Sequence, residues 1–232
     1  MQQCEEPMTR WRPVLILILL LIPLGELYGQ PPTPGMAIGR LKYGGGGDWY
    51  SNPTSLPNLA RALQNETSLW VTRIEETRLS PMDENLYNHP LVYMNGHGKI
   101  RFTEAEARRL RTYLLAGGFL FADDNYGMDE SFRQEIHRVF PDRELLELPY
   151  EHPIYHGIYD FPNGPPKIHE HDAKPAQGFG IFDDNGRLMV FYTYQADIGD
   201  GLEDPDVHSD PPQLREQAQR MAINVIFYAL TS

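Results

Sequence analysis

One strand–helix–strand unit, between residues 91 and 125, constrains the fold more than any other part of this sequence. The apolar run at residues 91–94 ends in Asn-Gly-His-Gly, and a second apolar run at 119–122 ends in Asp-Asp-Asn. Parallel strands joined by a helix have their carboxyl ends on the same side of a sheet, which is where open α/β sheets bind ligands. The unit therefore predicts a polar site at that end of the sheet.

The connecting helix has clear start and stop signals. Thr103 and Glu106 match a capping box, in which each side chain accepts a hydrogen bond from the other residue's backbone N–H. Gly117 and Gly118 end the helix, because glycine adopts the left-handed conformation without a steric penalty.

The other segments extend this unit into one α/β domain. We expect strands at 36–41, 69–74 and 145–148, the last as a fourth parallel strand, and helices beginning near Ser55, after Asp129 and over 214–230. Asp-Asp-Asn-Gly at 183–186 separates two strand-like runs, 178–182 and 187–193, and so predicts a β-hairpin. The stretch 150–177 has no clear period and is interpreted as a long functional loop.

The first 29 residues resemble a secretory signal. An apolar run at 14–22 follows Arg10 and Arg12 and is shorter than the roughly 20 residues that span a bilayer. We therefore expect an exported protein, periplasmic or extracellular, with a membrane tether through an uncleaved leader as the alternative. Residues 30–36 form a Pro-rich lead-in, and a single domain is expected over 37–231.

Charge and cysteine content narrow the function further. The net charge of −12 at pH 7 disfavours nucleic acid and anionic lipid as partners. Cys4 is the only cysteine and precedes the apolar run. Cleavage of the leader would therefore leave no thiol for catalysis, for metal binding or for a disulfide.

A glycine-rich turn follows the first predicted strand, at residues 44–50. Its consecutive glycines, with Gly45 and Gly46 at the centre, fit either a close approach of backbone N–H groups to an anion or a mobile turn. The turn ends in Asp48, Trp49 and Tyr50. An aromatic pair in a loop predicts either a lid on the core or a sugar or ring ligand.

Histidines and acids gather in two later loops. The 150–177 loop contains His152, His156, His169 and His171, and the next loop contains Asp197, Asp200, Glu203, Asp204 and Asp206. Imidazole with carboxylate suits zinc or iron, whereas all-oxygen clusters suit calcium. The spacing is not diagnostic, since His169 and His171 point to opposite faces of an extended segment. A divalent metal on the four histidines is thus the alternative to polar loop histidines that bond the backbone.

Asp123 and Asp124 occupy the place where a nucleophilic serine would follow a strand, and no G-x-S-x-G motif is present. A desolvated aspartate there could act as nucleophile or general base. Adjacent carboxylates are also ordinary caps of strand ends.

Four motifs, at residues 39–50, 95–98, 117–124 and 152–156, resemble an uncharacterised bacterial family, domain of unknown function 4159, over residues 37–231. The resemblance implies a fold similar to class I glutamine amidotransferase-like domains, a three-layer α/β sandwich of the flavodoxin type. In that larger group a glycine turn helps to form an oxyanion hole, and the next strand ends in a nucleophilic cysteine. Gly96 and Gly98 match the turn, but Asp123 or Asp124 replaces the cysteine, so the amidotransferase reaction is not expected.

Three functions remain as expectations. The first is an exported binding or scaffold module of the cell envelope that holds a polar, carbohydrate-like ligand in a crevice, with contacts from Gly45, Gly46, Asp48, Trp49, Tyr50, Asn95, Gly96, Gly98 and Asn125. The second is a hydrolase, optionally metal-assisted, that uses His97, Asp123 and Asp124. The third is an interaction module for an envelope protein, without a small-molecule site.

Overall fold

The computed structural model describes residues 35–232. The predicted signal peptide at 1–29, and with it the alternative of a membrane tether, lies outside the described residues, as does most of the lead-in at 30–36. Within residues 35–232, none of the helices combines the length and the hydropathy needed to cross a membrane.

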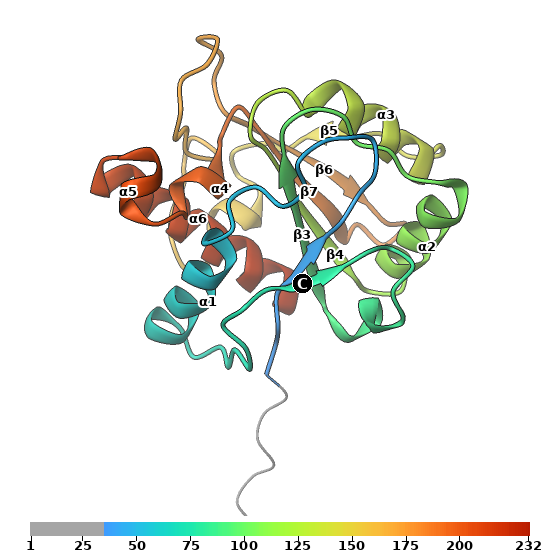
Figure 1. Ribbon diagram of the computed structural model, residues 1–232, viewed down its shortest axis with the longest axis horizontal. Helices are drawn as coiled ribbons and strands as arrows, with labels where there is room; N and C mark the ends of the chain where they lie inside the picture. Colours follow the sequence, from blue (N-terminus) through green and yellow to red (C-terminus); the bar gives the residue numbers. More distant parts are fainter. Residues whose placement is uncertain (1–34) are drawn as a thin grey trace, which may run out of the picture. The chain divides into compact units, whose positions relative to one another are not determined.

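A seven-stranded sheet forms the middle layer of the domain, in the order β2-β1-β3-β4-β7-β6-β5 (Figure 1). The strands are β1 (Gly39–Leu41), β2 (Thr77–Leu79), β3 (Leu91–Gly96), β4 (Phe119–Asp124), β5 (Leu146–Glu147), β6 (Gln177–Phe182) and β7 (Leu188–Tyr194). Pairing is parallel from β2 through β1, β3 and β4 to β7, whereas β6 is antiparallel to both β7 and β5. The mainly parallel sheet and the β6–β7 hairpin confirm the prediction.

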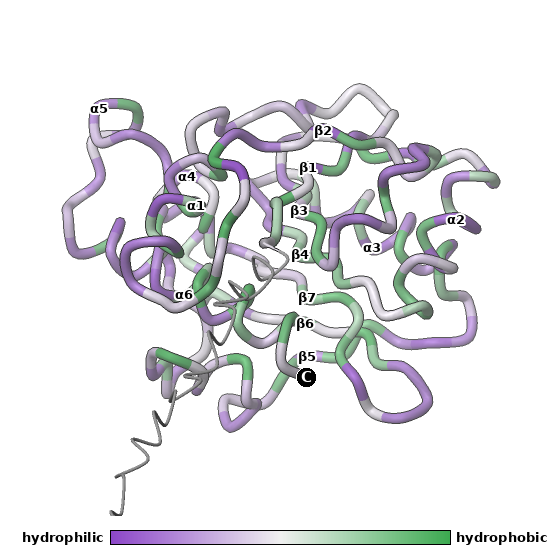
Figure 2. Tube along the Cα trace, turned by 90° about the horizontal axis from the view of Figure 1, so that it is seen from below, coloured by the Kyte–Doolittle hydropathy of each residue, from purple (hydrophilic) through white to green (hydrophobic). Residues whose placement is uncertain are grey.

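Helices cover both faces of the sheet and complete a three-layer sandwich (Figure 2). One face is covered by α1 (Ser55–Glu66) and α6 (Pro212–Thr231), and the other by α2 (Glu104–Leu115) and α3 (Asp129–Val139). The short helices α4 (Ile198–Gly201) and α5 (Pro205–His208) follow β7, and the 3₁₀ helices are η1 (Glu84–Asn88) and η2 (Pro153–Tyr155). Because helices cover both faces, every residue of β3 and β4 is buried, including the polar residues at their carboxyl ends.

The predicted capping box of α2 is present. Thr103 Oγ1 accepts a hydrogen bond from the backbone N–H of Glu106 at 3.2 Å, and Glu106 Oε2 accepts one from the N–H of Thr103 at 2.8 Å. The helix ends at Leu115, and Gly117 follows with a φ of 109°. Local chemistry alone therefore fixes both ends of this crossover helix.

Two predicted strands are wrong in position or pairing. The segment 69–74 contributes only a single bridge, Val71 to Met36, and β2 lies further on at Thr77–Leu79. The later register places Glu76 where its carboxylate meets the buried Arg40 guanidinium at 2.5 Å. The segment predicted as a fourth parallel strand forms β5, which pairs only with β6 and in antiparallel orientation, because β7 of the hairpin occupies the place beside β4.

The connections that follow β1 and β3, which are neighbours in the sheet, run to opposite faces. The helix that follows β1 covers one face, whereas the helix that follows β3 covers the opposite face. The loops after these two strands therefore part from each other at the carboxyl end of the sheet. In open α/β sheets such a switch point is where ligands bind.

Candidate functional site

Two segments far apart in the sequence meet at the carboxyl end of the sheet because β6 runs antiparallel to β7. Gln177 at the start of β6 lies opposite Tyr194 at the end of β7. The last part of the 150–177 loop, which carries His169 and His171, is thereby brought against the residues that follow β7.

Arg40 organises the loop after β1. Its side chain is fully buried, and its guanidinium pairs with Glu76 at 2.5 Å and donates to the carbonyl oxygens of Ser51 at 2.9 Å and Asn52 at 3.0 Å. It also donates to Asn95 Oδ1. A buried charge is tolerated only when it is paired and hydrogen-bonded. Arg40 therefore ties the loop at 51–52 to the ends of β1 and β3.

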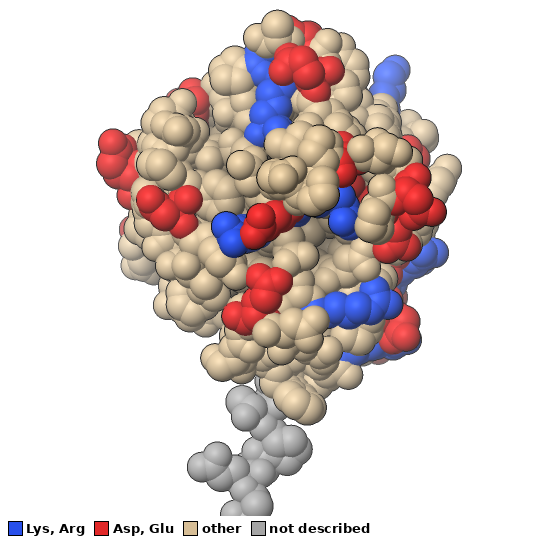
Figure 3. All heavy atoms as spheres, turned by 90° about the vertical axis from the view of Figure 1, so that its left-hand side faces the viewer, with Lys and Arg blue, Asp and Glu red and all other residues tan. Residues whose placement is uncertain are grey.

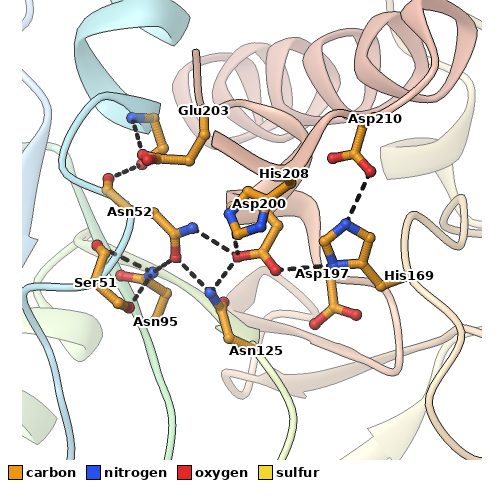
Figure 4. A network of polar contacts seen from close by, with 12 residues as sticks. Ser51, Asn52, Asn95, Asn125, His169, Asp197, Asp200, Glu203, His208 and Asp210 are labelled. Atoms are coloured by element: carbon orange, nitrogen blue, oxygen red, sulfur yellow. Dashed lines mark hydrogen bonds and ion pairs between the residues drawn. The ribbon is translucent and has the colours of Figure 1, made fainter. Parts of the chain in front are cut away.

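Three asparagines, Asn52 in the loop after β1, Asn95 in β3 and Asn125 directly after β4, continue this network, and we call them the amide cluster (Figure 4). Asn95 Nδ2 donates to Asn52 Oδ1 at 2.6 Å. Asn52 Nδ2 and Asn125 Nδ2 donate to Asp200 Oδ1 at 2.6 and 2.7 Å. The loops after β1 and β4, the end of β3 and helix α4 are thus joined by side-chain amides.

A second group, the histidine cluster, consists of His169, His171, Asp197, Asp200 and His208. His169 lies between two carboxylates, with Nδ1 at 2.9 Å from Asp200 Oδ2 and Nε2 at 2.9 Å from Asp210 Oδ1 (Figure 4). The bond to Asp200 is the main reason that the pKa of His169 is raised to about 9. Burial opposes ionisation of Asp200, but hydrogen bonds from His169 and Asn52 keep its pKa below the usual value.

The other half of the histidine cluster pairs the exposed His171 with the buried Asp197. His171 Nε2 lies 2.7 Å from Asp197 Oδ2, and the His171 ring stacks on Tyr126 with centroids 4.3 Å apart. Asp197 is fully buried, and this burial, reinforced by the charges of Asp123 and Asp200, raises its pKa to about 8. Its second oxygen, Oδ1, has no hydrogen-bond partner.

Backbone strain gathers around these side chains. Six non-glycine residues in the described part of the chain have positive φ angles, between 54° and 74°: Asn52, Tyr126, Ala173, Gln195, Asp197 and Ser209. They lie in the loops after β1, β4 and β7, or within two residues of His171 and His208. Such residues cost about 1–3 kcal/mol each and gather at functional sites. The strain therefore marks this end of the sheet independently of side-chain chemistry.

The residues predicted as catalytic are divided between the two faces of the sheet. Neighbouring residues of a strand point to opposite sides. Asp123 meets Thr193 Oγ1 at 2.5 Å and accepts from the Gly199 N–H at 2.7 Å, whereas Asp124 accepts from the Met128 N–H at 2.9 Å on the side of α3. Burial raises their pKa values to about 7 and about 6 respectively.

His97 is exposed and pairs with Asp48, with Nδ1 at 3.0 Å from Oδ2. This pair lies on the rim at the end of β3, and the charge of His97 acts on Asp124. Asp123 is engaged on the other face by β7 and α4. The structure therefore does not bring His97, Asp123 and Asp124 together as one catalytic group.

Most of the glycine turn approaches the backbone of the loop after β3, and only Gly46 faces open space. The N–H groups of Gly44, Gly47 and Asp48 donate to the carbonyl oxygens of Arg101, Lys99 and His97 at 3.1, 2.9 and 3.3 Å. A Cβ on Gly45 would lie 2.7 Å from Lys99 O, and one on Gly96 would meet the Tyr43 hydroxyl. The turn thus uses the N–H groups of Gly44, Gly47 and Asp48 to hold the loop after β3, whereas a Cβ on Gly46 would meet no atom within 4 Å. Gly46 and Gly98 both have positive φ angles.

The aromatic pair after this turn has two different environments. Trp49 packs against the core on the α2 and α3 side, with Lys42 and Arg78 over its ring. Tyr50 is 58% exposed and meets Trp49 edge to face. Trp49 is therefore a lid on the core, and only Tyr50 offers a free ring.

The four histidines predicted as metal ligands do not form one site. His152 packs against Phe182 and Tyr228, and His156 contacts Asp160 at 2.5 Å and the Tyr150 carbonyl oxygen at 2.7 Å. His169 and His171, expected to point apart, instead converge on Asp197 and Asp200.

Sequence analysis missed Arg40, Asn52, His208 and Asp210. The predicted hairpin was the available signal, because it already placed residues before 177 beside those after 194.

The candidate site is a buried polar network with an exposed rim. Surface hollows of about 570 and 400 Å³ lie beside α3 and between α1 and α6. No residue of the amide cluster or of the histidine cluster lines either hollow. The side chains that reach the surface are those of His171, His208 and Tyr126.

Fold and site together define a three-layer α/β domain with a buried amide network and a histidine–carboxylate cluster at the carboxyl end of its sheet. The chain belongs to the family described as a domain of unknown function, DUF4159, whose model matches residues 37–230. No curated protein matches the chain significantly.

Proposed function

We propose that this domain is an exported binding module of the cell envelope that holds a small, hydroxyl-rich ligand over the histidine cluster. The observation that carries this proposal is the concentration of strained backbone in the loops around that cluster. Strain persists only where the surrounding structure enforces it, and its use is to hold side chains in place for a ligand.

The polar groups at this place suit a hydroxyl-rich ligand. Asn125 Oδ1 and Asp197 Oδ1 are buried acceptors without a hydrogen-bond partner, and such groups gain most from a donor. Tyr126, 46% exposed and stacked on His171, offers an aromatic face beside them. Hydroxyl donors together with an apolar C–H face are the chemistry of a saccharide.

The proposal requires no covalent chemistry. The proposal includes a fold similar to that of class I glutamine amidotransferase-like domains, with Asp123 or Asp124 in place of the nucleophilic cysteine. Both oxygens of Asp123 are engaged, one by Thr193 and the other by Gly199. A fully engaged, buried carboxylate supports a role in holding α4 to β4 rather than a role as nucleophile.

Export rests on the leader-like run at residues 14–22. Acidic and basic side chains are intermixed on the face that carries α1, α4 and α5 (Figure 3). The chain has a net charge of −12, but the acidic side chains on this face do not gather into a patch of one sign. This distribution favours recognition of a small ligand by individual side chains over electrostatic docking there.

Saccharide binding can be measured by calorimetry with soluble peptidoglycan glycan fragments, using maltotetraose as the comparison sugar. We expect saturable binding of the glycan fragments that weakens about two- to tenfold in Tyr126→Ala, since stacking on an aromatic ring contributes about 0.5–1.5 kcal/mol. Tyr150→Ala is the matched control, because Tyr150 is 50% exposed but lies away from the histidine cluster. Absence of binding, or equal losses in the two variants, would refute the proposal.

A second function is favoured by the histidine cluster itself. Imidazole and carboxylate groups that converge at a partly exposed rim are suited to metal-assisted hydrolysis. This hydrolase would use the histidine cluster in place of His97, Asp123 and Asp124. Mass spectrometry of the glycan fragments after incubation with the protein distinguishes it from simple binding, because hydrolysis gives products that are 18 Da heavier in sum than the parent.

A further inference from the structure

We propose that His169, His171, Asp197 and Asp200 bind one divalent transition-metal ion, with His208 as an additional ligand. Their potential ligand atoms form two overlapping groups, His169 with Asp200 and His208, and His169 with His171 and Asp197. Within each group these atoms lie within 4.8 Å of one another. Two ligands of a tetrahedral ion with bonds of about 2.1 Å are about 3.4 Å apart, so shifts of an ångström or so close the site.

One buried carboxylate oxygen of this group has no hydrogen-bond partner. Asp197 is fully buried; its Oδ2 lies 2.7 Å from His171 Nε2, whereas its Oδ1 accepts no hydrogen bond. Buried carboxylate oxygens are normally hydrogen-bonded, paired with a charge or bound to a metal. The unpartnered atom is therefore accounted for by a cation that the neighbouring imidazoles help to hold.

Neighbouring carboxylate and amide groups already orient these ligands. Metal-binding histidines usually donate their other ring N–H to a carboxylate, which fixes the tautomer and the ring orientation. Asp210 Oδ1 is 2.9 Å from His169 Nε2, which leaves Nδ1 on the side of Asp200. Asp200 in turn accepts hydrogen bonds from Asn52 and Asn125 (Figure 4).

The donor set selects a class of ion. Nitrogen and carboxylate oxygen ligands without sulfur suit Zn²⁺ and neighbouring ions such as Co²⁺, whereas Ca²⁺ and Mg²⁺ prefer oxygen alone. His171 and His208 are at the surface, so an ion can enter from solvent without opening the core. The ion site shares the histidine cluster, including Asp197, with the proposed saccharide site, but ion binding does not require a saccharide, since an ion held here could be structural, catalytic or part of a ligand site.

Cobalt binding tests the site directly. The full-length protein, stripped with EDTA and dialysed, is titrated with Co²⁺ while the visible d–d absorption is recorded, and Zn²⁺ is then added as a competitor. We expect saturation at one equivalent and displacement by Zn²⁺. Lack of a saturable signal would overturn the proposal, whatever the outcome of the saccharide measurements.

Variants locate the ion. His171→Gln and Asp197→Asn are expected to weaken Co²⁺ binding at least about tenfold, and Asp210→Asn by about 10–100-fold through the orientation of His169. The matched control is His152→Gln with His156→Gln, two histidines of the same loop that lie elsewhere. Circular dichroism verifies that each variant is folded. If Asp197→Asn unfolds, His171→Gln still tests the site, because it changes a surface residue. A control that loses as much affinity as His171→Gln would place the ion elsewhere and refute the site.

Discussion

Replacement of Asp123 by asparagine should stabilise the domain at high pH and have little effect at low pH. Asp123 is fully buried at the end of β4, and burial is the main reason that its pKa is raised from 3.8 to about 7. In its protonated form it can donate to Thr193 Oγ1, which in turn lies 3.3 Å from the Ala122 carbonyl oxygen. Asparagine reproduces this pattern, because its Nδ2 donates to Thr193 and its Oδ1 accepts from Gly199.

The sign and the size of the effect follow from proton linkage. A carboxyl group whose folded pKa exceeds its unfolded pKa binds its proton more tightly in the folded state, so the free energy of unfolding falls as pH rises from 3.8 to about 7. Three pKa units at about 1.4 kcal/mol each give a ceiling of about 4 kcal/mol. Asp123→Asn removes this loss, so its advantage over the wild type is about 2 kcal/mol at pH 5 and approaches the ceiling at pH 8.

Urea unfolding at pH 5 and pH 8, followed by circular dichroism in the presence of EDTA, measures the difference. Asp142→Asn is a control of opposite sign: the exposed Asp142 has a pKa lowered to about 2 by its bond to Arg111, so its loss should slightly destabilise the protein at both pH values. If the stability difference between Asp123→Asn and the wild type were the same at pH 5 and pH 8, the proposed titration of Asp123 would be wrong.

Three further changes test the packing and capping described above. Arg40→Met removes the buried charge that Glu76, Ser51 and Asn52 share and leaves Glu76 paired only with the more exposed Arg78, so it should lower the free energy of unfolding by about 3–5 kcal/mol in urea; a loss below about 1 kcal/mol would contradict the structural role of Arg40. Gly201→Ala places a Cβ 2.5 Å from that of Ala218 and should destabilise by about 1–3 kcal/mol in thermal unfolding. Thr103→Ala removes the capping hydroxyl of α2 and should cost about 1 kcal/mol, with faster amide exchange in the first turn of that helix; unchanged exchange there would argue against the cap.

Local sequence signals predicted much of the fold. The capping box of α2, the glycines after it and the Asp-Asp-Asn-Gly turn act through neighbouring residues, so they can be interpreted without knowledge of the rest of the chain. The position of β2 could not be predicted this way. Its register depends on Glu76 reaching Arg40, which lies 36 residues earlier in the chain.

The sequence predicted a polar site at this end of the sheet, but not all of the residues that form it. The carboxyl end of β3 and β4 was expected to hold polar groups, and Asn95 and Asn125 do lie in the amide cluster there. The histidine cluster depends on the path of the 150–177 loop, which has no periodicity and is positioned by tertiary contacts alone. Its histidines and the acids after β7 therefore form two separate groups in the sequence, although the hairpin joins them in space.

The outermost strands of the sheet are very short: β2 has three residues and β5 has two. Unpaired backbone groups along a sheet margin are the usual template for adding a strand from another protein. Edge strands as short as these expose few unpaired backbone groups. The domain is therefore poorly suited to binding a partner by strand addition and is protected against stacking into extended β-aggregates. Any partner must then recognise the loops and helices instead.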